Sequence, residues 1–121
     1  KGNKKKVSYP PMPSVVFTLP TMATVGLLED DAKEKGYDIN VNFEKVDNWF
    51  NARRLNVDEY AYKTIIDKNN NTILGAHLIG PHCEETINLF AMAIKTKMTI
   101  SDLRTMVFSY PTMASDLTYM L

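Results

Sequence analysis

The N-terminal half of the chain alternates between short apolar runs and charged segments, and two of the runs have the features of β-strands. The run SVVFTL, residues 14–19, combines β-branched and aromatic residues and is closed by Pro20, which predicts a buried strand. The run YDINVNFEKV places Ile39, Val41 and Phe43 on one side and polar residues on the other. This two-residue period predicts a half-buried strand.

The segment YAYKTIIDKNNNTILGAHLIG predicts a β-hairpin. Two strand-like runs flank residues 68–71, and the asparagines of this loop tolerate the left-handed backbone that a hairpin turn requires. Gly75 and Gly80 bracket the second run. Glycine at such positions indicates a bulge or the close approach of another backbone.

The segment HCEETINLFAMAIKTKM has the spacing of a helix with two apolar sides. One stripe consists of Ile87, Phe90, Ala91, Ile94 and Met98. A second side is continued by Leu89, Met92 and Ala93. Because a domain of this size has little material to cover both sides, we expect one side to pack on the sheet and the other to meet a partner subunit. The predicted interface residues are Phe90, Leu89, Met92 and Ala93.

Shorter helices are indicated by charge and capping residues. Acids at 29–31 precede lysines and Gly36, the order that the helix dipole and a glycine C-cap favour. Thr99 and Asp102 have the spacing of a capping box that opens a short helix. Pro111 suits a first helical position, so a final helix is expected over residues 112–121.

The order of these elements predicts the fold class. Strand, helix, strand, hairpin and helical tail do not alternate as in a parallel sheet. We therefore expect an α+β fold, a mostly antiparallel sheet with helices packed on one face. The segment DNWFNARRLNVDE has no clean period, and only a connection is expected there.

Composition narrows the class of protein further. The 121 residues suffice for one domain, and 14 basic residues balance 14 acidic ones, so neither nucleic acid nor an anionic membrane is expected as a partner. Residues 1–12 contain a lysine run and prolines and are expected to be a linker, with the domain at residues 13–121. No apolar run approaches the ~20 residues of a membrane span. The single cysteine excludes an internal disulfide and favours a reducing compartment, the cytoplasm.

Few residues are candidates for a nucleophile, a metal ligand or a nucleotide-binding motif. Cys83 could be a nucleophile at a helix start, but Glu84 and Glu85 disfavour a thiolate, so a small buried residue is the better interpretation. His77 and His82 lack a third ligand at a set spacing, and no metal site is predicted; hydrogen-bonded structural roles are favoured. No glycine-rich nucleotide-binding motif occurs.

Four segments follow one another along the chain: PSVVFTLPTMATVGLLEDDA, YKTIIDKNNNTILGAHLIG, EETINLFAMAI and YPTMASDL. In this order they resemble the C-terminal dimerisation domain of pyridine nucleotide-disulfide oxidoreductases, the family of glutathione reductase, dihydrolipoamide dehydrogenase and mercuric reductase. The resemblance implies a homodimer and a chain that is a piece of a longer flavoenzyme. FAD, NAD(P)H and the redox-active cysteine pair would then be bound or carried by upstream FAD and NAD(P) domains, and this chain alone would be inactive.

The stretch FSYPTMASDL is where the resemblance implies a site. Many family members have His-Pro-Thr-x-x-Glu there, with the histidine acting on the partner subunit's thiol and flavin. Here Tyr110 stands at the histidine position, followed by Pro111, while Ser115 stands at the acid position and Asp116 follows one residue later. Tyrosine has a reference pKa of about 10 against about 6.5 for histidine, so it donates a proton but is a poor base. Tyr110 and Asp116 are the candidate catalytic residues in trans, and Tyr110 and Pro111 the candidates near the partner's flavin.

Three functions remain open at this point. The first is the dimerisation domain of an FAD-dependent, NAD(P)H-linked disulfide-type reductase. The second is a free-standing homo-oligomeric interaction module in which Tyr110 is structural. The third is a small thiol enzyme built on Cys83.

Overall fold

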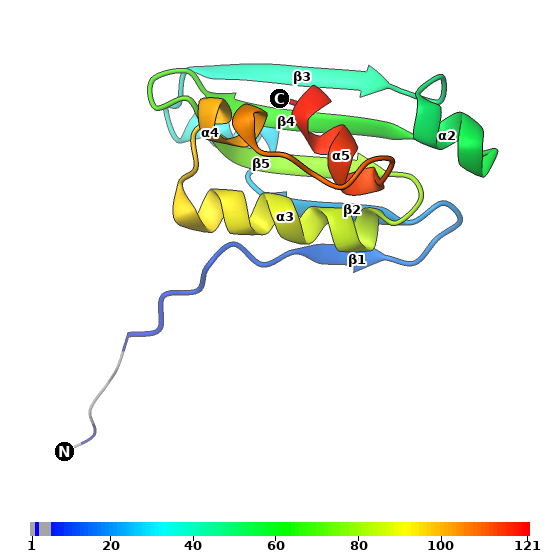
Figure 1. Ribbon diagram of the computed structural model, residues 1–121. Helices are drawn as coiled ribbons and strands as arrows, with labels where there is room; N and C mark the ends of the chain where they lie inside the picture. Colours follow the sequence, from blue (N-terminus) through cyan, green and yellow to red (C-terminus); the bar gives the residue numbers. More distant parts are fainter. Residues whose placement is uncertain (1, 3–5) are drawn as a thin grey trace.

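The computed structural model, which describes residue 2 and residues 6–121, has five strands in one sheet with the order β1-β2-β5-β4-β3 (Figure 1). Every neighbouring pair is antiparallel, which confirms the α+β prediction. The elements are β1 (Ser14–Val16), β2 (Met22–Gly26), α1 (Glu29–Glu34), β3 (Ile39–Lys45), α2 (Phe50–Leu55), β4 (Ala61–Asp67), β5 (Thr72–Ile79), α3 (Cys83–Thr96), α4 (Ile100–Thr105), α5 (Met113–Asp116) and the 3-10 turn η1 (Leu117–Tyr119). No helix among them is long and apolar enough to cross a membrane.

The predicted hairpin is present as β4 and β5. Asn71 adopts a left-handed φ of 54° in the loop, and the register shifts between Ile65 and Ile66, so a bulge is present as well. Gly75 allows a close approach, because a Cβ there would lie 2.0 Å from the carbonyl oxygen of Leu27. The bulge and the close approach of another backbone, which the glycines predicted as alternatives, are therefore both present.

The burial predicted for the two edge strands was correct only in part: Ile39 and Val41 of β3 are half-buried as expected, whereas β1 and Phe43 are mostly exposed. Residues 14–16 form β1 at one edge, where Val16 is 59 % exposed, and the following Phe17 is 79 % exposed. Phe43 lies on the opposite edge strand and is 71 % exposed. Edge strands have a neighbour on one side only, and no helix covers these side chains. The sequence prediction also missed β2, whose residues alternate between buried and exposed over only five positions.

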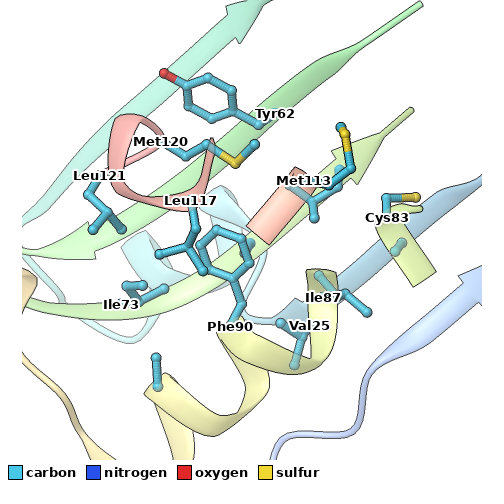
Figure 2. Close-up of a cluster of buried hydrophobic side chains, with 14 of the residues drawn as sticks. Val25, Tyr62, Ile73, Cys83, Ile87, Phe90, Met113, Leu117, Met120 and Leu121 are labelled. Atoms are coloured by element: carbon cyan, nitrogen blue, oxygen red, sulfur yellow. The ribbon is translucent and has the colours of Figure 1, made fainter. Parts of the chain in front are cut away.

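The helices cover the sheet unequally. Helix α3 packs on β5 and β2, and with α4, α5 and η1 it encloses the main core (Figures 1 and 2). Helix α1 lies on the other face, where its Glu29 pairs with Lys63 at 2.5 Å. The prediction that all helices share one face therefore holds for α3, α4 and α5 but not for α1.

Helix α3 divides the predicted interface residues into two groups. Phe90 and Ala93 are 0 % and 2 % exposed and lie in the chain's own core, where Figure 2 shows Phe90 beside Leu117. They are therefore unavailable to a partner subunit, and this part of the prediction was wrong. Leu89 is half-buried and Met92 is 63 % exposed, so their role at an interface stays a prediction.

The helix ends follow local capping rules, with one exception. Gly36 after α1 has a φ of 82°, and Thr99 and Asp102 form the expected capping box of α4. The final helix does not begin at Pro111. Thr112 is its N-cap, because its side chain accepts the Ser115 N–H, and α5 ends after four residues and is followed by η1.

The predicted N-terminal linker is described only in part. Residues 1 and 3–5 lie outside the described residues, while residues 6–13 contain neither helix nor strand and are almost entirely exposed. The boundary between linker and domain stays a prediction.

Candidate functional site

The candidate site is the turn between α4 and α5, drawn in orange in Figure 1. Its most prominent side chain is Tyr110, which is 70 % exposed. The Tyr110 ring stacks on Phe50, the first residue of α2, with 6.1 Å between ring centroids and 26° between planes. The peptide bond from Tyr110 to Pro111 is cis. We refer to residues 109–112 as the Tyr110 tip.

The backbone of the tip is held where α5 begins. The Thr112 hydroxyl accepts the Ser115 N–H at 3.2 Å, and the Thr112 N–H donates to Ser115 Oγ at 3.2 Å. The Thr112 hydroxyl also donates to the Ser109 carbonyl at 2.6 Å. From α2, the Asn51 Nδ2 group donates to the Thr112 carbonyl at 3.0 Å. The tip is therefore attached both to its own helix and to α2.

Asp116 does not accompany Tyr110. It is 7 % exposed, and its two carboxylate oxygens accept hydrogen bonds from Asn51 Nδ2 and the Tyr60 hydroxyl, each at 3.0 Å. Burial raises the pKa of Asp116, while the hydrogen bonds from Asn51 and Tyr60 oppose that rise. The Tyr60 pKa is raised as well, chiefly by burial and then by the Asp116 charge. The prediction that Asp116 acts with Tyr110 as a catalytic residue in trans is therefore wrong: the Asp116 side chain joins α5 to Asn51 of α2 and to Tyr60.

The residues that contact the tip were not identified from the sequence. Phe50 and Asn51 lie in the segment without a clean period, and Tyr60 immediately precedes β4. Asn51 lies 61 residues before Thr112 and 65 before Asp116. A polar residue in a short helix gives no signal of such distant partners, so only the structure reveals the connection.

A groove of about 520 Å³ runs beside the tip, between α3 and the start of α5. Its lining includes Arg54, His82, Glu85, Leu89 and Thr112. The groove carries charges of both signs next to apolar surface. Such a surface suits contact with another protein segment better than a single small charged ligand.

His77 and the cysteine have structural roles, whereas the His82 side chain is exposed and makes no side-chain cap hydrogen bond at the start of α3. His77 Nδ1 lies 2.5 Å from Thr24 Oγ1, and its Nε2 lies 3.2 Å from the Leu27 carbonyl, which confirms the expected hydrogen-bonded role. Cys83 is 2 % exposed and its thiol donates to the Thr21 carbonyl at 3.0 Å. Burial, with a contribution from the Glu84 charge, raises the pKa of Cys83 to about 11. The thiol is therefore protonated near neutral pH, which removes the basis of the thiol-enzyme hypothesis.

Among the described residues, the N-terminus of the longest helix does not suit the phosphates of FAD or NAD(P)H. A dinucleotide pyrophosphate needs a glycine-rich turn at a helix N-terminus. The first turn of α3, the longest helix, instead carries Glu84 and Glu85, whose charges oppose a phosphate. Across residue 2 and residues 6–121, no three His, Cys, Asp or Glu side chains come together to hold a metal ion.

Comparisons with known proteins place these features in context. Residues 12–121 match the family model of the pyridine nucleotide-disulphide oxidoreductase dimerisation domain. The chain is 46 % identical over 121 residues to an uncharacterized 19.7 kDa protein in a mercuric resistance operon of Staphylococcus aureus, covering all of this chain and 67 % of that protein. It is 34 % identical over 116 residues to the mercuric reductase of Lysinibacillus sphaericus, covering 96 % of this chain but 21 % of the reductase.

A solved structure agrees with the sequence relatives. The HOCl-induced flavoprotein disulfide reductase RclA from Escherichia coli superposes with a TM-score of 0.88 at 31 % identity, over 97 % of this chain and 28 % of that one. The chain therefore spans about a fifth to a quarter of the length of the reductases that it matches.

Proposed function

Because the chain belongs to the dimerisation-domain family of the pyridine nucleotide-disulphide oxidoreductases, we propose that it forms the homodimer of an FAD-dependent, NAD(P)H-linked reductase and supplies Tyr110 in trans to the active site of the partner subunit. FAD, NAD(P)H and the redox-active cysteine pair would be bound or carried by other segments of that enzyme. The chain's own contribution is association and a positioned phenol.

The observation that carries the proposal is the Tyr110 tip. Its phenol is 70 % exposed, while the neighbouring Thr112 is bonded to Ser115 and Asn51. An exposed side chain on an anchored backbone can reach a group outside its own domain. Tyrosine donates a proton or a hydrogen bond readily and is a poor base near neutral pH, so the role that fits is donation to a leaving thiolate or to an anion.

Exposed apolar side chains on α3 and after α4 support self-association. Met92 on α3 is 63 % exposed, and Met106 and Val107, which follow α4, are 45 % and 96 % exposed. Exposed large apolar side chains become favourable contacts when a second protein surface covers them. We place the homodimer contact on the outer side of α3, with Leu89 and Met92, and on residues 106–107.

Association is tested by sedimentation velocity of the chain over a concentration series. We expect a dimer whose dissociation constant rises at least tenfold in Met92→Glu, because a charge placed in an apolar contact must lose its hydration. Phe43→Glu is the matched control, since it replaces an exposed apolar side chain by the same charge on edge strand β3, away from α3. Equal dimerisation of the two variants would place the interface elsewhere.

The trans role of Tyr110 is tested in mixed dimers of a chimera in which this chain replaces the matching segment of the L. sphaericus mercuric reductase. One subunit lacks the redox-active cysteine pair but keeps Tyr110, and the other keeps the cysteines but carries Tyr110→Phe. A tip that acts in trans restores NADPH-dependent turnover at the intact cysteine site. Activity no higher than that of the Tyr110→Phe homodimer would refute the trans role; Tyr37→Phe serves as the control.

A second candidate, a free-standing homo-oligomeric module, is favoured by one observation. A protein 46 % identical to this chain has a mass of only 19.7 kDa, and the chain covers 67 % of it, so a sequence of this kind also occurs in a short protein. Under this alternative Met92→Glu disrupts association, while Tyr110→Phe has no effect in either assay.

A further inference from the structure

Resting on the proposed function, we infer that Phe50 and Asn51, the first two residues of α2, are positioning residues for Tyr110. They are adjacent in the chain, yet they contact two different parts of the tip. Phe50 stacks on the Tyr110 ring, and Asn51 donates to the carbonyl of Thr112, two residues further on. One short helix therefore fixes both the ring and the backbone that carries it.

The orientation of the Asn51 amide is set by its partners. A carbonyl and a carboxylate can only accept hydrogen bonds, so the Nδ2 group must face the Thr112 carbonyl and Asp116 Oδ1, both at 3.0 Å. The Oδ1 atom then faces Arg54, whose Nη2 donates to it at 3.2 Å. The reversed amide would place an oxygen against two acceptors. Asn51 is 1 % exposed, so water cannot relieve that conflict.

The chain of contacts ends on the sheet. Asp116 accepts from the Tyr60 hydroxyl at 3.0 Å, and Tyr60 is 2 % exposed at the start of β4. The path from β4 through Tyr60, Asp116 and Asn51 to Thr112 consists of buried side chains with fixed partners. The tip is thereby connected to the central sheet, although residues 106–111 contain no helix or strand.

The arrangement suits a side chain that must act outside its own domain. To act in the partner's site, the Tyr110 ring must already be held in position when the two subunits associate. A misplacement of about 1 Å can lower the reaction rate on the order of 100-fold. The Ser115–Thr112 capping box fixes the backbone of Thr112 alone. Phe50 supplies the contact that orders the ring, and Asn51 supplies the contact that joins the tip to the sheet.

The decisive variants separate tip positioning from core stability. In the exchange Asn51→Asp with Asp116→Asn, the bond between positions 51 and 116 survives with its donor and acceptor reversed, and Tyr60 still has an acceptor. The donor to the Thr112 carbonyl is lost, because a carboxylate now faces it. Asp116→Asn alone is the matched control, since it keeps that donor. Phe50→Leu removes the ring contact at a position that is 48 % exposed, with the exposed Phe43→Leu as its control.

The first measurement is backbone and ring dynamics of the 121-residue chain by NMR. We expect the order parameter of the Tyr110 amide to fall from about 0.85 to below about 0.6 in Phe50→Leu and in the exchange variant. Asp116→Asn and Phe43→Leu should match the wild type. Unchanged order of Tyr110 in both test variants overturns the inference. If the exchange variant does not fold, Phe50→Leu alone decides it.

The second measurement uses the mixed dimer described above. If the positioning inference holds, Phe50→Leu on the subunit that supplies Tyr110 lowers kcat on the order of 10- to 100-fold and leaves KM for NADPH unchanged. Phe50→Leu should cause no further loss of kcat when position 110 is already Phe, because Phe50 acts only through the Tyr110 phenol. A loss that persists without Tyr110 indicates a general structural role and overturns the inference. If Tyr110→Phe itself leaves turnover unchanged, the proposed function is refuted. The NMR measurement then still tests whether Phe50 and Asn51 position Tyr110.

Discussion

Asp116 allows a sharp test of the buried hydrogen-bond network. In Asp116→Ala, Asn51 loses one of its two acceptors, and the Tyr60 hydroxyl loses the one acceptor that it has among the described residues. Each buried donor left without a partner costs about 1–3 kcal/mol, so we expect the free energy of unfolding to fall by about 2–5 kcal/mol. In Asp116→Asn the new Oδ1 accepts from Asn51, and the new amide donates to the Tyr60 oxygen, so only the Tyr60 hydroxyl proton lacks an acceptor. One unsatisfied donor in place of two should limit the loss to about 1–2 kcal/mol near neutral pH, less than in Asp116→Ala.

The two variants also differ in their dependence on pH. The raised pKa of Asp116 means that the native state holds the proton more firmly than the unfolded chain, whose value is near 3.8. The stability that this group contributes is therefore fully present below about pH 3.8 and is lost as the pH rises through the native pKa. Relative to Asp116→Asn, the wild type should lose stability as the pH rises above about 3.8.

The assay is urea unfolding at several pH values, followed by the fluorescence of Trp49. This tryptophan is the only one in the chain, and its ring lies within 6.0 Å of the rings of Tyr60, Tyr62 and Tyr119. It therefore reports the packing of the same corner of the domain. Equal losses for Asp116→Ala and Asp116→Asn would refute the reasoning, because they would show that the carboxylate charge, not its hydrogen bonds, holds α5 in place.

Three further outcomes follow from the packing. Phe90→Ala should lower the free energy of unfolding by about 3–5 kcal/mol in urea titrations, because Phe90 is fully buried; a loss below about 1 kcal/mol would return Phe90 to the surface. Burial lowers the pKa of His77, so the native state binds its proton less readily, and stability should fall as the pH drops below about 6.5; His77→Gln should remove this slope. Gly75→Ala should lower Tm by several degrees, because its Cβ would lie 2.0 Å from the Leu27 carbonyl oxygen; an unchanged Tm would mean that β2 and β5 can separate locally.

The parts of the fold predicted from sequence are those determined by neighbouring residues. The hairpin depends on the turn around Asn71, and the capping box of α4 depends on Thr99 and Asp102. The edge strand β1 was assigned a buried role because Val16 and Phe17 are apolar, yet burial depends on what covers an element. That is decided by contacts far along the chain.

The same reason explains the mixed outcome on α3. Two apolar sides were recognised correctly, but the pattern does not indicate which side faces the sheet. Phe90 lies at the centre of the stripe that packs on β2 and β5, while Met92 turns outward. The assignment needs the position of η1, whose Leu117 lies beside Phe90 (Figure 2). The family motif located the tip, but its contacts with α2 span more than 60 residues and leave no periodic signal.

The position of the acid in FSYPTMASDL has a structural consequence for the tip. Successive residues of a helix are rotated by about 100°, so moving an acid from position 115 to 116 turns it away from the N-cap. Ser115 caps Thr112, and Asp116 faces the interior, where Asn51 and Tyr60 bond it. No carboxylate is then left to orient the side chain at position 110. A histidine there would need such a partner to act as a base, whereas a phenol that only donates does not. The tyrosine at position 110 and the inward acid are therefore consistent with each other, and the stacking of Phe50 takes over the task of holding the ring.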